Sequence, residues 1–130
     1  MSSEPADVVH AWLTAANAGD VDRVLALTAP EIVLIGPRGR AAGHDVLRAW
    51  LASAGARFET RRRFARGPAV VVAQHGVWRD AASGTIVGEA AVATRFVVQA
   101  GRVAELERFD RLEDALGAAG LGVADEIPGA

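Results

Sequence analysis

Hydrophobic residues recur with a helical period in the first part of the chain and with a strand period in the second. Val9, Trp12 and Leu13 follow the spacing of one helix face, and an Asn-Ala-Gly-Asp turn follows them. The spacing repeats twice before residue 55. Helices are therefore predicted over residues 5–18, 21–28 and 43–54.

The second part of the chain predicts a series of hairpins. Alternating apolar and polar residues are separated by short glycine-containing turns, and Ala100-Gly101 suits a two-residue hairpin turn. A short helical piece follows at residues 112–116, and residues 117–130 are expected to form a flexible tail. The predicted strands are residues 31–35, 56–65, 69–79, 85–99 and 102–110.

Helices followed by hairpins indicate an α+β fold in a single domain, with a core over about residues 6–116. We expect one curved antiparallel sheet folded around a layer of three N-terminal helices. The sequence shows no internal repeat, linker or second domain.

Composition excludes several classes of chemistry. The net charge is −2 and the sequence pI is about 5.9, which gives no electrostatic footprint for nucleic acid. No uncharged apolar run reaches the roughly 18 residues of a membrane helix, and no signal segment is evident, so a cytoplasmic location is expected. The chain lacks cysteine, lysine and tyrosine. Its three histidines lie at no metal-ligand spacing, so neither a metal nor a cofactor is expected.

Four stretches resemble the nuclear transport factor 2-like superfamily, in particular its SnoaL-like and ketosteroid isomerase-like branch. They are VVHAWLTAANAGDVDRVLALTAPEIVL, GRAAGHDVLRAWL, FVVQAGRVAEL and ERFD. The resemblance implies a cone-shaped, cystatin-like roll with a hydrophobic pocket at its open end, often in a homodimer. Members include isomerases, polyketide cyclases, dehydratases, epoxide hydrolases and domains that only bind or assemble.

The catalytic groups of ketosteroid isomerases are absent at the matching positions. Gly36 stands where the family's general-base aspartate precedes a proline, and Trp12 stands where a tyrosine donates to the oxyanion. The second donor, an aspartic acid, falls near Ala93 or Thr94. The aspartate–arginine–aspartate network of limonene epoxide hydrolases is not matched either, because Arg108 falls near one of its aspartates.

A regular two-residue turn at Ala100-Gly101 fixes which residues face each other across the last two strands. It predicts that Arg95 faces Leu106 and that Ala93 faces Arg108, while the preceding hairpin brings His75 opposite Glu89. The predicted pocket-facing set is Val71, Ala73, His75, Val77, Glu89, Ala91, Ala93, Arg95, Leu106, Arg108 and Asp110.

This face supplies a candidate proton-transfer site. His75, oriented by Glu89 or Asp110, is predicted to act as a general base near neutral pH. Arg108 or Arg95 would hold a carboxylate, enolate or carbonyl oxygen of the substrate. Ligand contacts are predicted for Trp12, Trp50, Phe58, Arg62, Ala91, Ala93, Arg95 and Leu106.

Two alternatives remain open at this point. In the first, His75 lies on the outer face and is only solvated, while Arg108 and Asp110 pair with each other or with Glu89. A bulge in either hairpin would reverse the phase and turn Glu105 and Glu107 inward in place of Arg108 and Asp110.

The predicted function is that of a small-molecule pocket protein. It would be a cofactor-independent acid–base isomerase, cyclase, dehydratase or hydrolase acting on a small hydrophobic carbonyl or polyketide-like compound. The alternative is a non-catalytic ligand-binding domain or a dimeric assembly domain of the same fold.

Overall fold

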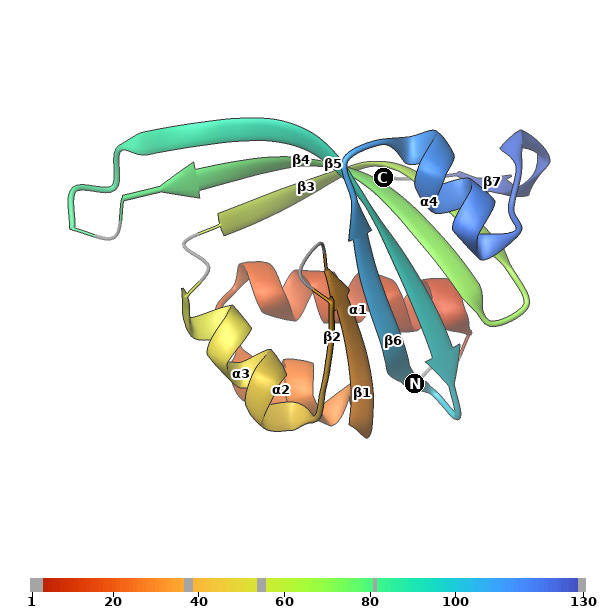
Figure 1. Ribbon diagram of the computed structural model, residues 1–130, viewed down its shortest axis with the longest axis horizontal. Helices are drawn as coiled ribbons and strands as arrows, with labels where there is room; N and C mark the ends of the chain where they lie inside the picture. Colours follow the sequence, from red (N-terminus) through yellow and green to blue (C-terminus); the bar gives the residue numbers. More distant parts are fainter. Residues whose placement is uncertain (1–3, 37–38, 54–55, 81, 129–130) are drawn as a thin grey trace.

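A computed structural model describes residues 4–36, 39–53, 56–80 and 82–128 of the chain (Figure 1). Parts of two predicted features, the loop after the first strand at residues 37–38 and the end of the third helix at residues 54–55, lie outside the described residues. The predicted α+β class is confirmed. Helices α1 (Pro5–Asn17), α2 (Val21–Ala26) and α3 (His44–Ser53) lie on one side of a curved sheet.

The turn between α1 and α2 follows the predicted chemistry. Gly19 adopts a φ of 73°, which suits a glycine at the end of a helix. Asp20 then caps α2, because its carboxylate accepts a hydrogen bond from the backbone nitrogen of Arg23 at 3.1 Å. This turn allows two helices of different direction to pack against the same sheet.

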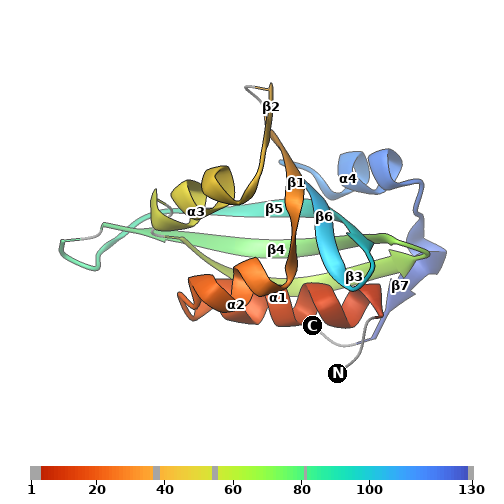
Figure 2. The same cartoon turned by 90° about the horizontal axis from the view of Figure 1, so that it is seen from below.

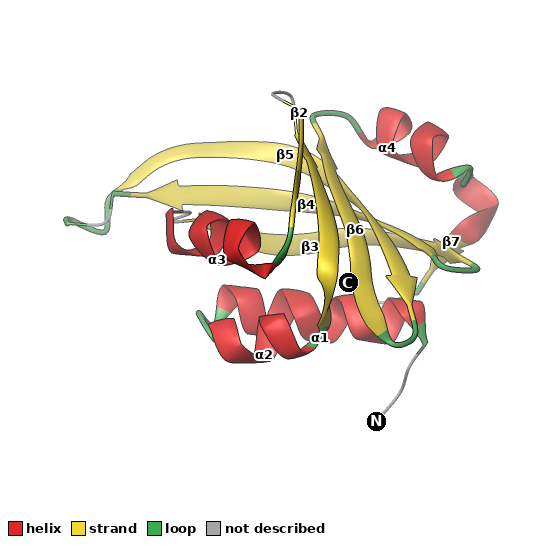
Figure 3. Cartoon of the chain, turned by 60° about the horizontal axis from the view of Figure 1, so that its bottom comes forward, coloured by secondary structure: helices red, strands yellow, loops and turns green. Residues whose placement is uncertain are grey.

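The sheet has seven strands in the order β2-β1-β6-β5-β4-β3-β7 (Figure 2). Most neighbours are antiparallel, but β1 pairs with β6 in parallel (Figure 3), so the expectation of a wholly antiparallel sheet is wrong. The strands are β1 (Thr28–Gly36), β2 (Gly39–Ala42), β3 (Ala56–Arg66), β4 (Ala69–Arg79), β5 (Ile86–Gln99), β6 (Arg102–Phe109) and β7 (Glu126–Ile127).

Bulges in β6 and β3 change the phase of these strands. Ala100 and Gly101 have φ of 52° and 75°, and Val98 pairs with Val103, as a two-residue turn requires. Ala104 is then left unpaired, because Val97 pairs with Glu105. A similar irregularity lies in β3, where the pairing with β4 steps from Thr60 to Arg62. Residues beyond each bulge therefore face the side opposite to the one that simple alternation predicts.

The two faces of the sheet bury separate clusters. The inner face packs against α1, α2 and α3 around Trp12, Ile32 and Phe96. The outer face of β3, β4 and β5 is covered at one end by α4 (Leu112–Ala119), with Phe64 and Val71 fully buried beneath it. The helices of the inner layer thus cover one face of the strands, while the rest of the outer face is left open.

The C-terminal segment is more ordered than the sequence indicates. The helix predicted to end at residue 116 continues to Ala119, and β7 adds to the free edge of β3. Arg62 holds this strand through two hydrogen bonds, 2.9 and 2.8 Å long, to the carboxylate of Glu126. The expectation of a loose tail over residues 117–130 is therefore not met as far as residue 128.

At the opposite end, the β4–β5 hairpin projects beyond the helical layer (Figure 1). Its strand β5 carries two exposed apolar side chains, Ile86 and Val87, with 46% and 66% of their surfaces accessible. None of the helices in the described part of the chain is long and apolar enough to cross a membrane.

Candidate functional site

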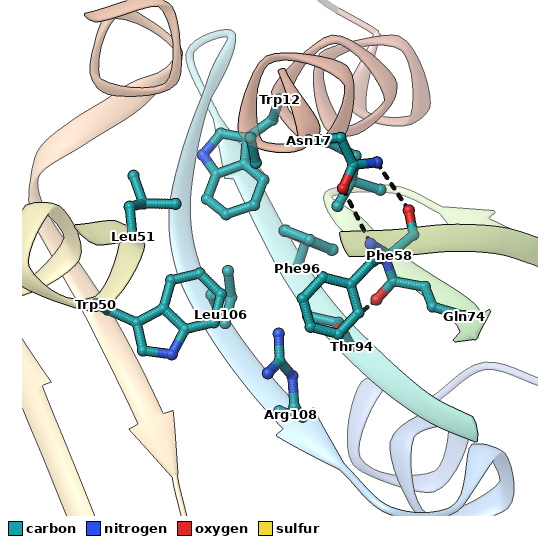
Figure 4. A pocket seen from close by; sticks show the side chains of 12 residues that line it. Trp12, Asn17, Trp50, Leu51, Phe58, Gln74, Thr94, Phe96, Leu106 and Arg108 are labelled. Carbon is teal, nitrogen blue, oxygen red and sulfur yellow. Dashed lines mark hydrogen bonds between the residues drawn. The ribbon is translucent and has the colours of Figure 1, made fainter. Parts of the chain in front are cut away.

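An interior cavity lies between the inner face of the sheet and helices α1 and α3 (Figure 4). Its volume is about 40 Å³. Aromatic rings make up much of its wall, and Arg108 is the only charged side chain among its described lining residues. The lining residues are Trp12, Leu13, Ala16, Asn17, Trp50, Leu51, Phe58, Gln74, Thr94, Phe96, Leu106 and Arg108.

Arg108 projects into the cavity from β6, directly opposite Thr94 on β5. Its guanidinium lies 4.4 Å from the ring centre of Phe58 and 5.0 Å from that of Trp50. Both contacts are cation–π interactions, which partly compensate a cation for the loss of water. Burial lowers the pKa of Arg108, yet an arginine stays protonated throughout the range in which proteins are folded.

Gln74 on β4 is the second polar group on this face, and only 3% of its surface is exposed. The hydroxyl of Thr94 donates a hydrogen bond to the side-chain amide oxygen of Gln74 at 3.0 Å. This bond fixes the side chain of Gln74, because Thr94 is itself buried and held by its strand. The amide nitrogen is left without a partner among the described residues.

Asn17, at the end of α1, positions the ring of Phe58. Its side-chain amide donates to the carbonyl of Phe58 at 2.7 Å and accepts from the nitrogen of the same residue at 3.0 Å. The pair of bonds ties the helix to the edge of β3. It also fixes the residue whose ring covers Arg108.

Trp12 belongs to the rigid back wall of the cavity. Its indole nitrogen donates to the hydroxyl of Thr28 at 2.9 Å, and its ring meets that of Phe96 edge to face at 5.5 Å. Thr28 in turn donates to the carbonyl of Val24, and the ring of His44 donates to the carbonyl of Thr28 at 3.0 Å. The indole is fully satisfied here and has no donor to offer a ligand.

A second, mainly apolar hollow of about 290 Å³ adjoins the cavity beside α3 and β1. It shares Trp50, Leu106 and Arg108 with the cavity, so the guanidinium stands where the two spaces meet. Its other walls are Leu34, Ile35, Gly36, Gly39, Ala41 and Val46.

The register predicted for β4, β5 and β6 is wrong. Thr94, not Ala93, lies opposite Arg108, and Phe96, not Arg95, lies opposite Leu106, because of the bulge at Ala104. The alternative in which Glu105 and Glu107 turn inward is wrong as well, because both carboxylates bind Arg95 on the outer face. Leu106 and Arg108 face inward as predicted, while their partners on β4 and β5 are the even-numbered residues.

His75 therefore lies on the outer side of the sheet, away from the interior cavity. It is opposite Ala91 rather than Glu89, although its Nε2 still lies 3.2 Å from Oε1 of Glu89 on the diagonal. His75 lines an open groove of about 420 Å³ whose other described lining residues come from α1, β3 and β4. Asp110, beyond the end of β6, is exposed. The geometry brings together two of the predicted catalytic groups, and neither of them borders the cavity.

The predicted ligand contacts divide in the same way. Trp12, Trp50, Phe58 and Leu106 line the cavity. The remaining four do not: Ala91 is exposed on the outer face, Ala93 is buried beneath α4, Arg62 holds Glu126, and Arg95 is taken up by two glutamates.

Arg95 forms ion pairs with two glutamates on the outer face. Its guanidinium lies 2.5 Å from Glu105 and 3.0 Å from Glu107. Burial lowers the pKa of Arg95, but the hydrogen bonds to the two carboxylates outweigh that effect and raise it. Arg95 is thus a structural cation, whereas Arg108 on the opposite face has no carboxylate partner among the described residues.

Sequence reasoning missed Gln74 and Thr94. Both are polar residues within apolar runs, and they share the even phase of Val70, Val72 and Phe96. That phase was the available signal, but three consecutive valines at residues 70–72 fit either face equally well. No cluster of histidine, aspartate and glutamate among the described residues is arranged to hold a metal ion.

The curved sheet, its helical layer and the interior cavity define a cystatin-like α+β protein of the nuclear transport factor 2-like class. A profile of the SnoaL-like domain matches residues 9–106, and the chain belongs to that family. A search of curated proteins finds no match.

Solved structures show the same fold at low sequence identity. TerC, co-crystallised with polyporic acid, is 18% identical with a TM-score of 0.72, over 91% of this chain and 98% of that one. A predicted polyketide cyclase from Sinorhizobium meliloti is 22% identical with a TM-score of 0.67, over 78% and 93% of the two chains. A predicted ketosteroid isomerase from Kribbella flavida is 16% identical with a TM-score of 0.70, over 81% and 76%.

Proposed function

We propose that this protein binds a small, partly apolar organic compound in its interior cavity and the adjoining hollow. The observation that carries the proposal is a half-buried guanidinium, that of Arg108, whose Nε is fully buried and which is aimed into a space walled by aromatic and aliphatic side chains. Mostly apolar walls with a few fixed polar groups are typical of small-molecule sites.

The composition of the cavity supports a ligand rather than a packed core. A core position that served only stability would be filled by an aliphatic residue, because a buried charge without a partner is costly. Here an arginine and a glutamine each keep a buried nitrogen without a hydrogen-bond partner among the described residues. Such groups require an explanation, and a bound molecule with acceptor atoms is one.

The structural neighbours add general support for a small-molecule role. TerC was crystallised with polyporic acid, and two other neighbours are predicted to act as a polyketide cyclase and a ketosteroid isomerase. At such low identity they are evidence of fold, so the compound bound by this chain follows from its own residues.

Proton-transfer catalysis on a carbonyl compound is the second candidate. Arg108 favours it, because a preorganised cation in a water-poor site stabilises a developing enolate oxygen. The described lining residues of the cavity include no carboxylate or imidazole to take the proton. Binding is therefore the function that the geometry supports best, and turnover would need a base supplied by the ligand or by water.

The test is a thermal-shift screen with small ketones, lactones and aromatic acids, followed by nuclear magnetic resonance titration of each hit. Val46→Trp on α3 places a large ring in the adjoining hollow and should abolish the shifts. Ala49→Trp, on the exposed side of the same helix, is the matched control and should retain them. Equal responses in both variants would rule out the cavity as the binding site. Exchange of substrate α-protons in deuterated water would distinguish turnover from binding.

A further inference from the structure

Two buried nitrogen atoms in the cavity have no acceptor among the described residues. They are Nε of Arg108 and the amide nitrogen of Gln74. Both side chains come from the inner face of the sheet and line the same cavity (Figure 4). A buried donor that finds no acceptor loses its hydrogen bonds to water without replacement.

The sheet places these donors on neighbouring strands. Arg108 on β6 is directly opposite Thr94 on β5, and Thr94 holds the amide oxygen of Gln74 on β4. Side chains directly opposite each other have Cβ atoms about 4.5–5.5 Å apart. Because Thr94 occupies the oxygen of the amide, the nitrogen is the end that remains for another molecule.

Charge balance adds a second requirement. The nearest acidic residues along β6, Glu105 and Glu107, point to the other face and are held by Arg95. The rings of Phe58 and Trp50 contact the guanidinium of Arg108 but carry no net charge. The cavity is therefore positive, with no anion from the described residues to balance it.

We infer that the cavity ligand is an organic carboxylate whose oxygens accept hydrogen bonds from Arg108 and Gln74. This inference rests on the proposed function and specifies the chemical class of its ligand. A carboxylate supplies two acceptor oxygens and one negative charge, which match two donors and one cation. Charge-assisted hydrogen bonds of this kind are stronger than neutral ones.

The adjoining hollow indicates the shape of the rest of the molecule. It opens beside Arg108 and is walled by Leu34, Ile35 and Val46 together with the ring of Trp50. Its volume of about 290 Å³ lies at the small end of known ligand sites, which span about 300–1,000 Å³. A compact hydrocarbon or aromatic group, attached directly to the carboxylate, fits this arrangement.

Matched probes separate the contribution of the charge from that of the apolar group. We would titrate the protein with 2-naphthoate, 2-naphthamide and 2-naphthylmethanol at pH 7 and low salt by calorimetry. The acid should bind at least tenfold more tightly than either neutral probe. Higher salt should weaken its binding only slightly, because buried pairs are poorly screened.

Variants assign the preference to its donors. Arg108→Met should remove the preference for the acid, and Arg108→Lys should retain part of it because the charge is kept. Gln74→Leu should weaken acid binding several-fold with little effect on the neutral probes. Arg102→Met, which removes an exposed arginine from the start of the same strand, should change nothing.

Each outcome decides between the two proposals. Equal affinities for the acid and the amide would overturn the carboxylate assignment and leave small-molecule binding intact. A preference for the acid that survives Arg108→Met and disappears in Arg102→Met would place the anion on the surface and overturn it too. If none of the probes binds and the screen gives no hit that Val46→Trp abolishes, the proposed function fails as well.

Discussion

Arg108 is costly to bury, and the proposed function gives a reason for its presence. It is held between two rings and opposite Thr94, and the structure provides it with no carboxylate among the described residues. The cation–π contacts recover part of the lost hydration, on the order of 0.5–2 kcal/mol. The remaining cost is tolerated by the free protein and would be relieved by a bound anion.

Replacing Arg108 with methionine should therefore stabilise the free protein. We expect the free energy of unfolding to rise by about 1 kcal/mol, because a buried charge is exchanged for an apolar chain of similar length. We expect this stabilisation at every pH at which the protein is folded, because the guanidinium stays protonated despite its lowered pKa. Urea unfolding measures the change. A loss of stability would show that the guanidinium has partners that compensate its burial.

Gly76 controls the position of the ring that covers Arg108. A Cβ atom at this position would lie 2.9 Å from Phe58 and 2.9 Å from Trp78. Gly76→Ala should destabilise the fold by about 1–3 kcal/mol and displace the ring of Phe58. Gly88→Ala on β5 is the control, because its Cβ would meet Trp78 only at an ordinary 4.0 Å. Equal unfolding free energies in the two variants would contradict this account.

The lining residues show what sequence reasoning can reach at this scale. Trp12, Trp50 and Phe58 were predictable because large aromatic residues on an apolar helix face or strand point to the core. Gln74 and Thr94 were not, because their placement depends on strand phase. The register of β6 against β5 depends on one unpaired residue, Ala104, and an alanine gives no sequence signal for a bulge.

Among the elements, the bulged strands and the short C-terminal strand have the largest effects. β7 pairs with β3 through few residues, and the bidentate contact between Arg62 and Glu126 supplements that pairing. The hydrogen bonds from Arg62 lower the pKa of Glu126. A carboxylate with a lowered folded-state pKa stabilises the protein fully above its ordinary pKa and loses that effect as the pH falls through the lowered value.

We therefore expect β7 to loosen in acid while the rest of the sheet persists. Hydrogen exchange at Ile127 should accelerate as the pH falls through the lowered pKa of Glu126, after correction for intrinsic rates. Glu126→Gln should produce the same loosening at pH 7. Asp114→Asn, at an exposed position on α4, should have no such effect. Unchanged protection at Ile127 in Glu126→Gln would show that main-chain pairing alone holds the strand.

At the scale of the whole molecule, the order of elements predicted the architecture and the family, while contacts distant in sequence escaped prediction. The parallel pairing of β1 with β6 joins segments about seventy residues apart, and no local pattern specifies it. β2 was missed because four residues of small and polar type resemble a loop. The single-domain expectation remains consistent with one continuous sheet.

We propose that the open outer face of the sheet pairs with a second copy of the chain. His75 and Glu89 flank Ala91 on this face, and a two-fold axis near Ala91 would let each histidine meet the glutamate of the other copy. Ala91→Arg should shift the protein from dimer to monomer in sedimentation velocity runs. Ala118→Arg, on the exposed side of α4, should leave the dimer intact. A wild-type protein that is monomeric at high micromolar concentration would refute the pairing.

The alternation in β4 and β5 places adjacent residues in different surroundings. Gln74 lines the interior cavity, and His75, the next residue, lines an open groove on the surface. Under the proposed function, mutations at position 74 would alter ligand preference without changing the outer surface, and mutations at position 75 would do the reverse. A combinatorial library restricted to one parity would explore a single property at a time, which makes this short stretch of chain a convenient starting point for laboratory evolution.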